Sequence, residues 1–398
     1  MRFGWTALSE GVLTKRILLV LTAVLAVTSS AGCKQGPWNL WQSYSARFID
    51  AQGRVIDPKA NDHTTSEGQS YAMFFALVDN DREHFDRALG WAQANLAGGD
   101  MGSRLPGWNW GKAQDGQWKV LDPNPASDSD CWIAYSLLEA GRTWREPKYA
   151  ALGKTMLHLI EKQEVAELPG FGSMLMPGPT ATWVHGKTFT VNPSYVPLFL
   201  VERFQEIDPA GPWGAIAMNI PRLLRQSSRH GFAMDWADYV ANDGFYPSPP
   251  PGPNANGKSD KPALGSYDAI RVYLWAGMLD DAGRTRTDMI GAVSGMAAYL
   301  TNHTAPPEKV NAEGVPQEGD GPVGFSGAVL PYLRAIPDMA KSASQQRIRI
   351  GAQLDASTGL YGKDPAYYDQ NLILFATGFS DGRFRFGPRG ELKVEWTR

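Results

Sequence analysis

The sequence predicts an all-α protein, an (α/α)6 barrel in which six helical hairpins close into a ring and a few short β-hairpins occupy the long loops. Helical periodicity recurs in twelve segments, and the links between them alternate between long and short. Residues 51–65 and 97–126 form long links, whereas 79–80 and 145–146 form short ones. In such a ring every long link leads into the N-terminus of an inner helix. We therefore expect one end of the barrel to collect all the long loops.

The helical segments are recognised by apolar residues at helical spacing and by capping residues at their starts. They run over residues 37–49, 66–78, 81–96, 127–144, 147–162, 193–205, 212–226, 267–279, 284–299, 324–335, 342–354 and 366–377. Alternating patterns with turn residues predict small hairpins in 111–120 and 383–396. The segment 246–262 is too rich in proline to form a helix or strand, so it is interpreted as a mobile surface loop inserted between two helices.

The composition is that of a globular protein with a large core. The chain has 398 residues, of which 43% are hydrophobic and 20% charged, and its net charge is −3. Because no basic stripe is present, the sequence argues against nucleic acid as a partner. Fourteen Trp, 14 Tyr and 16 Phe make the chain rich in aromatic residues. Many fall in predicted loops, where flat apolar rings suit the binding of sugars.

The N-terminus is typical of a targeting segment. Lys15 and Arg16 precede an apolar run, 17–27, that has signal-peptide length and is short for a membrane span. Small residues at 30–32 then precede Cys33. We expect a signal peptide over 1–32, which also fits a lipoprotein signal with Cys33 as the first mature residue, followed by a single domain over 33–398. The protein would then be periplasmic or secreted, or an outer-membrane lipoprotein anchored through a lipid on Cys33.

Four helix starts carry the polar residues of interest. Thr64, Thr65 and Ser66 can each cap the second helix, which puts Glu67 in its first turn. A carboxylate in that place usually does no more than complement the helix dipole. A second polar helix start also follows a long loop. There, Ser127 or Asp128 can cap the fourth helix.

The other two starts add a phenol, a carboxylate and a cation. Tyr195 follows a proline that suits the first turn of a helix. Asp268 again follows a long loop, with Arg271 three residues on and so on the same helix face. The helix behind this pair is apolar nearly all round, as expected of a buried inner helix. A surface salt bridge is the ordinary reading of such a pair, but a charged pair at the mouth of a buried helix indicates a functional site.

Two carboxyl groups at one rim suit glycoside hydrolysis. One group stays protonated to give a proton to the leaving oxygen, and the other is ionised to take a proton from water. A helix N-terminus lowers carboxyl pKa values, so Glu67 as the acid needs an apolar wall or a nearby like charge, for which Asp128 is the candidate. Asp268 is then the base. A separation of about 6.5–9.5 Å between the two carboxyl groups would mean inversion, and about 5 Å retention.

Other catalytic designs fit less well. Residues 324–328 end in Ala where a nucleophile elbow needs Gly, and no strand leads into them. The six histidines show no metal-ligand spacing, and no glycine loop that could hold a phosphate precedes a helix, so we expect neither a metal nor a cofactor. Trp108 and Trp110 lie in a long loop of the same face. Beside two carboxylates, Trp110 is interpreted as a stacking platform for a sugar ring.

At these residues the sequence resembles glycoside hydrolase family 8, and within it the endoglucanases of bacterial cellulose synthesis. The resemblance extends over nearly the whole mature chain. It rests on residues 53–57, 64–71, 126–140, 192–197, 266–273, 306–310 and 321–326. The stretch 126–144 is similar to the family signature and departs from it at Ser129, where Ala or Gly is usual.

The resemblance implies a metal-free (α/α)6 barrel that cleaves β-1,4-glucan internally with inversion. By motif, Glu67 is the acid and Asp268 the base, and Asp128 holds the sugar before the scissile bond in a distorted shape. Tyr195 helps to position the water, and Trp110 and Arg271 line the substrate site. The association with cellulose synthesis implies trimming or release of nascent glucan, and the synthase complex as a partner.

Two alternatives stay open at this point. The same fold could hydrolyse another β-1,4 polymer such as xylan or chitosan. A non-catalytic component of an export assembly could instead bind glucan through its aromatic rings alone. The Glu67→Gln variant discriminates between catalysis and binding.

Overall fold

The computed structural model describes residues 36–397 except 253, 255–256, 281–283 and 318, and these described residues belong to one compact unit. The predicted signal segment, 1–32, and Cys33 lie outside the described residues. Among the described residues no helix combines the length and the apolar character needed to cross a membrane.

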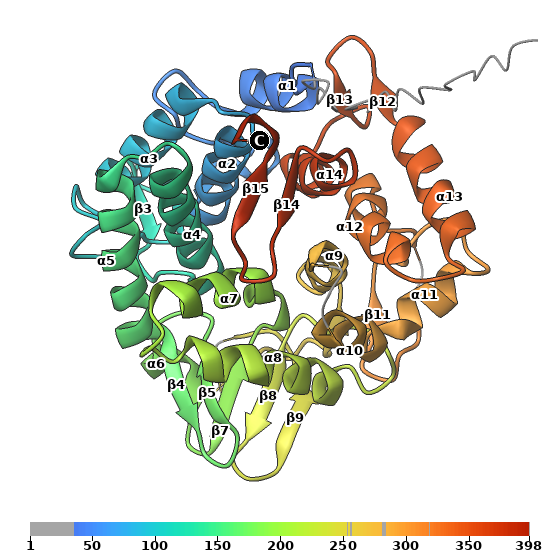
Figure 1. Ribbon diagram of the computed structural model, residues 1–398. Helices are drawn as coiled ribbons and strands as arrows, with labels where there is room; N and C mark the ends of the chain where they lie inside the picture. Colours follow the sequence, from blue (N-terminus) through green and yellow to red (C-terminus); the bar gives the residue numbers. More distant parts are fainter. Residues whose placement is uncertain (1–35, 253, 255–256, 281–283, 318, 398) are drawn as a thin grey trace, which may run out of the picture. The chain divides into compact units, whose positions relative to one another are not determined.

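The described chain forms two concentric layers of helices (Figure 1). Inner and outer helices alternate along the chain, as predicted for an (α/α)6 barrel. The inner layer consists of α2 (Ser66–Val78), α4 (Ser127–Thr143), α7 (Leu198–Ile207), α9 (Ile270–Met278), α12 (Val323–Arg334) and α14 (Tyr367–Ser380). The outer layer consists of α1 (Asn39–Phe48), α3 (Arg82–Asn95), α5 (Pro147–Glu164), α8 (Trp213–Ser227), α10 (Arg284–Ala292), α11 (Ser294–Leu300) and α13 (Ala340–Gly351).

Burial separates the two layers as the hydrophobic patterns predict. In α2 every residue from Gly68 to Val78 is buried, and in α9 every residue from Ile270 to Met278. The outer helices bury one face only, as in α3, where five residues are buried. Aromatic rings fill the middle of the ring, with Phe74, Trp132 and Phe375 in mutual contact at centroid distances of 4.9 to 5.4 Å. The core is therefore continuous across inner helices that are far apart in sequence.

Three predicted helices differ from the observed ones for local reasons. The segment 193–205 divides into the 3₁₀ turn η2 (Pro193–Tyr195) and α7, because Pro197 excludes Val196 from the helical conformation. The segment 284–299 breaks at Val293, which has φ −117° and ψ 30°. Helix α9 begins at Ile270 rather than at 267. Asp268 therefore lies in a turn ahead of the helix, not in its first turn.

Both predicted hairpins are confirmed. Strand β2 (Asn109–Lys112) pairs with β3 (Trp118–Asp122), and β1 (Thr64–Thr65) adds to the edge of β2. Strand β14 (Phe384–Phe386) pairs with β15 (Leu392–Val394) in the terminal hairpin. Since β1 ends where α2 begins, the first sheet holds the start of α2 against the loop that precedes α4.

The long loops hold more strands than the sequence predicts. The largest sheet has the order β6-β7-β8-β9. Its strands have two to four residues and join loops that are distant in sequence, so they leave no readable periodicity. The additional strands are β4 (Val165–Leu168), β5 (Gly172–Leu175), β6 (Val184–His185), β7 (Thr188–Val191), β8 (Ala237–Val240), β9 (Gly244–Pro247), β10 (Leu264–Gly265), β11 (Val310–Asn311), β12 (Leu354–Asp355) and β13 (Leu360–Tyr361). A short helix, α6 (Thr180–Trp183), was also not predicted.

The proline-rich segment 246–262 is not simply a mobile surface loop, which corrects the prediction. It begins inside β9, and Ser248 is buried. Lys258 is 7% exposed, and its ammonium group donates to Asp238 at 2.6 Å and to the Thr190 hydroxyl at 2.5 Å. The partners of Lys258 stand on β8 and β7, which the sequence could not place beside it. The segment is therefore anchored on the four-stranded sheet.

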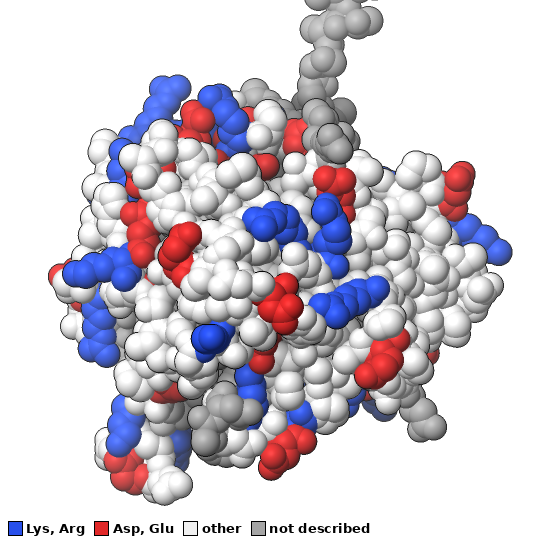
Figure 2. Space-filling view, turned by 90° about the horizontal axis from the view of Figure 1, so that it is seen from below, with Lys and Arg blue, Asp and Glu red and all other residues white. Residues whose placement is uncertain are grey.

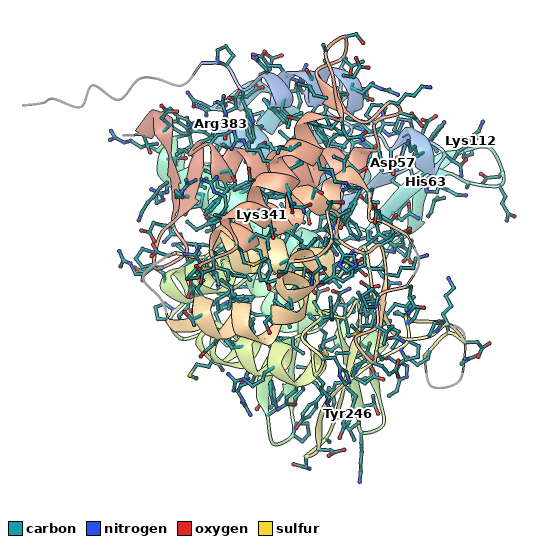
Figure 3. The ribbon with its side chains drawn as sticks, turned by 90° about the vertical axis from the view of Figure 1, so that its right-hand side faces the viewer. Asp57, His63, Lys112, Tyr246, Lys341 and Arg383 are labelled. Carbon is teal, nitrogen blue, oxygen red and sulfur yellow. The ribbon has the colours of Figure 1, made fainter. Side chains whose placement is uncertain are left out.

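The terminal hairpin covers one end of the barrel, and the loop strands lie at the other. The hairpin crosses the middle of the ring in Figure 1, and Glu139 of α4 accepts hydrogen bonds from Leu392 N at 2.8 Å and Arg203 Nε at 2.7 Å. In Figure 3, Asp57, His63 and Lys112 lie at the end opposite Arg383. On the face seen in Figure 2, basic and acidic side chains are interspersed.

Two buried carboxyl groups face each other in the barrel wall. Asp130 on α4 and Glu164 at the end of α5 are both 0% exposed. Among the described residues, neither carboxyl has a cationic or amide partner, and burial is the largest cause that raises both pKa values. The folded protein therefore keeps a proton at a pH where the unfolded chain has released it. The free energy of unfolding should fall as pH rises above the ordinary carboxyl range, by about 1.4 kcal/mol per pH unit for each retained proton.

The Glu164→Gln variant should remove most of this pH dependence. The Gln amide can donate to Asp130, which no longer needs a proton of its own to lie there. Urea unfolding at several pH values between about 5 and 8 measures the slope. The matched control is Glu167→Gln on β4, an exposed glutamate that accepts from Ser173 Oγ at 2.9 Å, and it should leave the slope unchanged. An unchanged slope in Glu164→Gln would contradict the interpretation that this buried carboxyl pair retains a proton in the folded protein.

Candidate active site

One arginine joins the predicted site residues. Arg271, in the first turn of α9, is 3% exposed and contacts the carboxylate of Glu67 through Nη1. The same nitrogen lies 3.3 Å from Asp128 Oδ2, and Nη2 lies 2.7 Å from Asp268 Oδ1. Nη2 also donates to Ser194 Oγ at 3.1 Å. The four charged residues, predicted separately at the starts of three helices, thus form one cluster.

Glu67 is positioned by the start of α2. Thr65 is the N-cap, and its hydroxyl accepts from Gly68 N at 3.1 Å. Thr64 pairs with Trp110 in the sheet, which fixes the approach of the chain to the helix. A Cβ on Gly68 would lie 2.7 Å from the hydroxyl of Tyr367, so the small residue lets α14 approach. Glu67 itself is 21% exposed, enough for a substrate to reach it.

Asp128 does not cap α4, which corrects that part of the prediction. The N-cap is Ala126, without a side-chain hydrogen bond, and Ser127 does not cap either. Asp128 Oδ1 instead accepts from Ser129 N at 2.7 Å and from Ser129 Oγ at 3.2 Å. Its other oxygen is left to face Arg271. Asp128 is therefore held one residue inside the helix, with its carboxylate directed at the cluster.

Asp268 is held on both carboxylate oxygens. Arg271 donates to Oδ1, and Asn192 Nδ2 donates to Oδ2 at 3.1 Å. Asn192 in turn caps η2, because its Oδ1 accepts from Ser194 N at 3.0 Å. Asp268 remains 31% exposed, the most open of the three carboxylates. A base that must meet a water molecule needs this access.

Tyr195 lies beside the same arginine. It belongs to η2, and the Arg271 guanidinium carbon is 5.5 Å from the centre of its ring. Burial raises its pKa well above the usual value, followed by the charges of Asp128 and Asp268. The phenol therefore stays a neutral hydroxyl that can donate or accept a hydrogen bond near Asp268.

Trp110 packs against two other tryptophans and an arginine. Its ring stacks on Trp118 at 5.1 Å, meets Trp91 edge-on at 5.3 Å, and carries the Arg54 guanidinium 4.4 Å from its centre. Trp108 is 39% exposed, and its carbonyl accepts from Ser66 N at 3.0 Å, directly before Glu67. The backbone of Trp108 thus bonds to Ser66, the residue before Glu67, whereas Trp110 pairs with Thr64. The sugar-stacking role of Trp110 stays a prediction, and the exposed Trp108 is the alternative residue for that role.

Several residues of the cluster were not singled out from the sequence. Asn192 and Ser194 could have been found, because an Asn before a proline is a common helix-start signal. Tyr71 lies one turn after Glu67, and its hydroxyl is 3.4 Å from Glu67 Oε1. Asp235, which contacts the turn that carries Asp268, stands in a loop without any motif. No local signal points to it.

The electrostatics of Glu67 suit a proton donor. Its pKa is raised to about 7, first by burial and further by the charges of Asp128 and Asp268, while Arg271 opposes the shift. The pKa of Asp128 is also raised by burial, against the effect of Arg271. Glu67 therefore has both kinds of environment that were expected to raise its pKa: it is buried, and it lies near negative charges.

The Asp128→Asn variant should move the alkaline limit of activity to lower pH. Loss of a negative charge beside Glu67 favours its ionised form, so the pKa of Glu67 falls and the proton is lost earlier. In the unchanged protein, kcat/KM should decline above about pH 7, since this parameter reports the free enzyme. The profile is measured on a soluble glucan. Asp243→Asn, an exposed control on the β8–β9 turn, should leave the limit in place, and a limit that stays or rises in Asp128→Asn contradicts the assignment.

A second group of polar residues lies outside this cluster. His158 and Glu161 on α5 and Asp208 after α7 have ligand atoms within 4.8 Å of one another, and in the described part of the chain they are the residues near enough together for a metal. His158 is exposed, whereas Glu161 and Asp208 are partly buried. Nothing at the Arg271 cluster depends on them.

Comparisons with known proteins identify the family of this chain. The sequence profile of glycosyl hydrolases family 8 matches residues 11–382. An endoglucanase of Xanthomonas axonopodis pv. citri is 43% identical over 98% of this chain and 96% of its own length. An endoglucanase of Escherichia coli K12 is 39% identical over 98% of this chain and 97% of its own. The crystal structure of an endo-1,4-D-glucanase from Vibrio fischeri ES114 has a TM-score of 0.81 at 35% identity, covering 91% of this chain and all of that one.

Proposed function

The chain belongs to glycosyl hydrolases family 8 and is an endoglucanase of that family, and on this premise we propose that it cleaves internal bonds of β-1,4-glucan with inversion. Glu67 is the general acid and Asp268 the general base. The observation that supports these roles is the contact of Arg271 with Glu67, Asp128 and Asp268 together. Glu67 has a pKa near 7, while Asp268 is ion-paired and more exposed, so the two carboxyls suit opposite roles.

The reaction proceeds in one displacement. Glu67 gives its proton to the glycosidic oxygen as the bond from that oxygen to the anomeric carbon breaks. A water molecule forms the new bond to that carbon from the opposite face, and its proton passes to Asp268. Tyr195 orients the water, since its ring lies beside Arg271, which binds Asp268. Asp128 binds the sugar before the scissile bond. Arg271 holds the carboxyl groups of Glu67, Asp128 and Asp268 in their relative positions.

The proposed biological role is the trimming or release of nascent glucan in bacterial cellulose synthesis, with the synthase complex as the partner. The resemblance of the sequence to the endoglucanases of that system supports it. The apolar run before Cys33 supports export to the periplasm or beyond, with an outer-membrane anchor if Cys33 is lipidated. Fractionation of cells that express the full chain, with and without Cys33→Ser, tests the anchor.

A polymer panel with anomeric analysis tests the activity. We expect release of reducing ends from carboxymethylcellulose, and weaker or no release from xylan and chitosan. Nuclear magnetic resonance of a cello-oligosaccharide digest should show the α-anomer first. A β-anomer that forms first would overturn the inverting mechanism. A preference for xylan or chitosan would instead favour the alternative substrates, and binding without hydrolysis a glucan-binding role.

A further inference from the structure

We propose that Asp235 is the positioning residue of the catalytic base, because its carboxylate organises the turn Ser266–Ala269 on which Asp268 lies. The inference rests on the proposed function, in which Asp268 takes the proton from water. Asp235 stands in the long loop between α8 and α9, away from any sequence motif. It acts through the backbone of the turn rather than on the substrate.

Three hydrogen bonds connect Asp235 to the turn. Asp235 Oδ1 accepts from Ser266 N and from Ala269 N, both at 2.8 Å. Its Oδ2 accepts from the Ser266 hydroxyl at 2.5 Å. Asp268 lies between the two residues whose amides share one oxygen. The carboxylate therefore holds the chain on both sides of the base.

The turn needs an outside partner. The first amides of a helix have no acceptor within the helix, and they are usually capped by the side chain just before it. Helix α9 lacks such a cap, since the N-cap residue is Ala269, whose own side chain cannot accept a hydrogen bond. Asp235, 34 residues earlier in the chain than Ala269, supplies the acceptor instead. Because Asp235 belongs to a separate loop, its hydrogen bonds fix the position of the turn Ser266–Ala269 relative to that loop.

Asp235 is itself held firmly. Its amide donates to Leu264 O at 2.8 Å, and Ala233 N donates to the Tyr273 hydroxyl of α9 at 3.0 Å. A Cβ on Gly265 would lie 2.0 Å from Ala233 O, so only a glycine lets the two segments come this close. The loop is thus fixed to β10 on one side and to α9 on the other.

The side chain of Asp268 has separate anchors. Asn192 and Arg271 hold its two oxygens, and Asp235 holds its backbone. Burial and then the charge of Asp268 raise the pKa of Asp235 to about 6. Misplacement of a reacting group by about 1 Å can cost on the order of 100-fold in rate. Loss of the backbone anchor should therefore affect the chemical step even when both side-chain contacts survive.

Two substitutions at Asp235 separate geometry from charge. In Asp235→Asn the retained oxygen can accept from both amides, and the new amide can donate to the Ser266 hydroxyl. In Asp235→Glu the charge is kept but the carboxylate is displaced by one methylene. We expect kcat to stay within threefold in Asp235→Asn and to fall about 10- to 100-fold in Asp235→Glu. In both variants KM on carboxymethylcellulose should stay within about twofold. The control is Asp243→Glu on the exposed β8–β9 turn, which should match the unchanged protein.

The outcomes decide the proposal in either direction. It is overturned if Asp235→Glu keeps kcat within twofold, or if Asp235→Asn loses as much as Asp235→Glu. A merely structural role would lower thermal stability in both variants without this order of kcat values. If Asp235→Glu does not fold, Ser266→Ala decides, since it removes one hydrogen bond and should lower kcat about 3- to 10-fold at constant KM. Asp268→Asn is measured alongside: if that variant stays active, the proposed function has failed, whatever the Asp235 variants show.

Discussion

The Glu67→Gln variant should release reducing ends from carboxymethylcellulose about 10²- to 10⁴-fold more slowly than the unchanged protein. A Gln amide has no proton to transfer to the glycosidic oxygen at neutral pH. Its carbonyl oxygen can still accept from Arg271, so the cluster should keep its arrangement. We therefore expect the loss in kcat, with glucan binding retained. Steady-state kinetics and isothermal titration with a cello-oligosaccharide measure the two quantities separately.

The matched control is Glu83→Gln. Glu83 also stands in the first turn of a helix, but α3 belongs to the outer layer and the Glu83 side chain is 78% exposed. It should leave kcat unchanged and alter the free energy of unfolding by no more than about 0.5 kcal/mol. If Glu67→Gln kept full activity, Glu67 would be a dipole-complementing carboxylate like Glu83. Lost turnover with binding intact excludes a protein that only binds glucan.

The Asp268→Asn variant should lose a comparable factor in kcat, about 10²- to 10⁴-fold. Asn cannot take a proton from the attacking water. The structural cost should be small, because Asn can still offer one oxygen to Arg271 Nη2. The amide group would face Asn192 Nδ2, so one donor meets another and a modest loss of stability is expected. Initial rates on soluble glucan and thermal unfolding give the two results.

Asp243→Asn serves as the control for this variant, since Asp243 lies on an exposed turn of the β6–β9 sheet and contacts Tyr246. Its rate should equal that of the unchanged protein. Activity in Asp268→Asn above about one tenth of normal would show that another group removes the proton. Asp235 and Asp128 would be the carboxylates to test next, because both lie near Asp268.

The proposed mechanism requires opposite protonation states of Glu67 and Asp268, and one cation, Arg271, contacts both groups. Arg271 neutralises the cluster enough for three carboxylates to come together, and it pairs with Asp268 at 2.7 Å. Glu67 is more buried than Asp268, 21% against 31% exposed, and it also feels the charge of Asp128. Burial thus favours the protonated form of Glu67, while the arginine holds the carboxylate of Asp268 in place. Substitution of Arg271 would disturb both roles together.

Much of the fold could be predicted from local pattern. The range 66–78 agrees with the observed α2, because capping and helical spacing act over a few residues. The alternation of long and short links indicated the ring of hairpins, because link lengths can be read directly from the sequence. The short strands of the four-stranded sheet could not be predicted, since β7 and β8 belong to loops about 50 residues apart. Their pairing depends on where the helices bring those loops.

The sequence by itself determined which residues stand at the mouth of the barrel. A cap at Thr65 and a proline before Tyr195 are local signals, so Glu67, Asp128, Tyr195 and Asp268 could be placed at one rim. Only the tertiary structure decided that Arg271 joins three carboxylates, that Asp235 holds the turn of Asp268, and that Trp110 stacks on Trp118. The pKa of Glu67 belongs with these, because burial and the charge of Asp128 come from packing between separate helices.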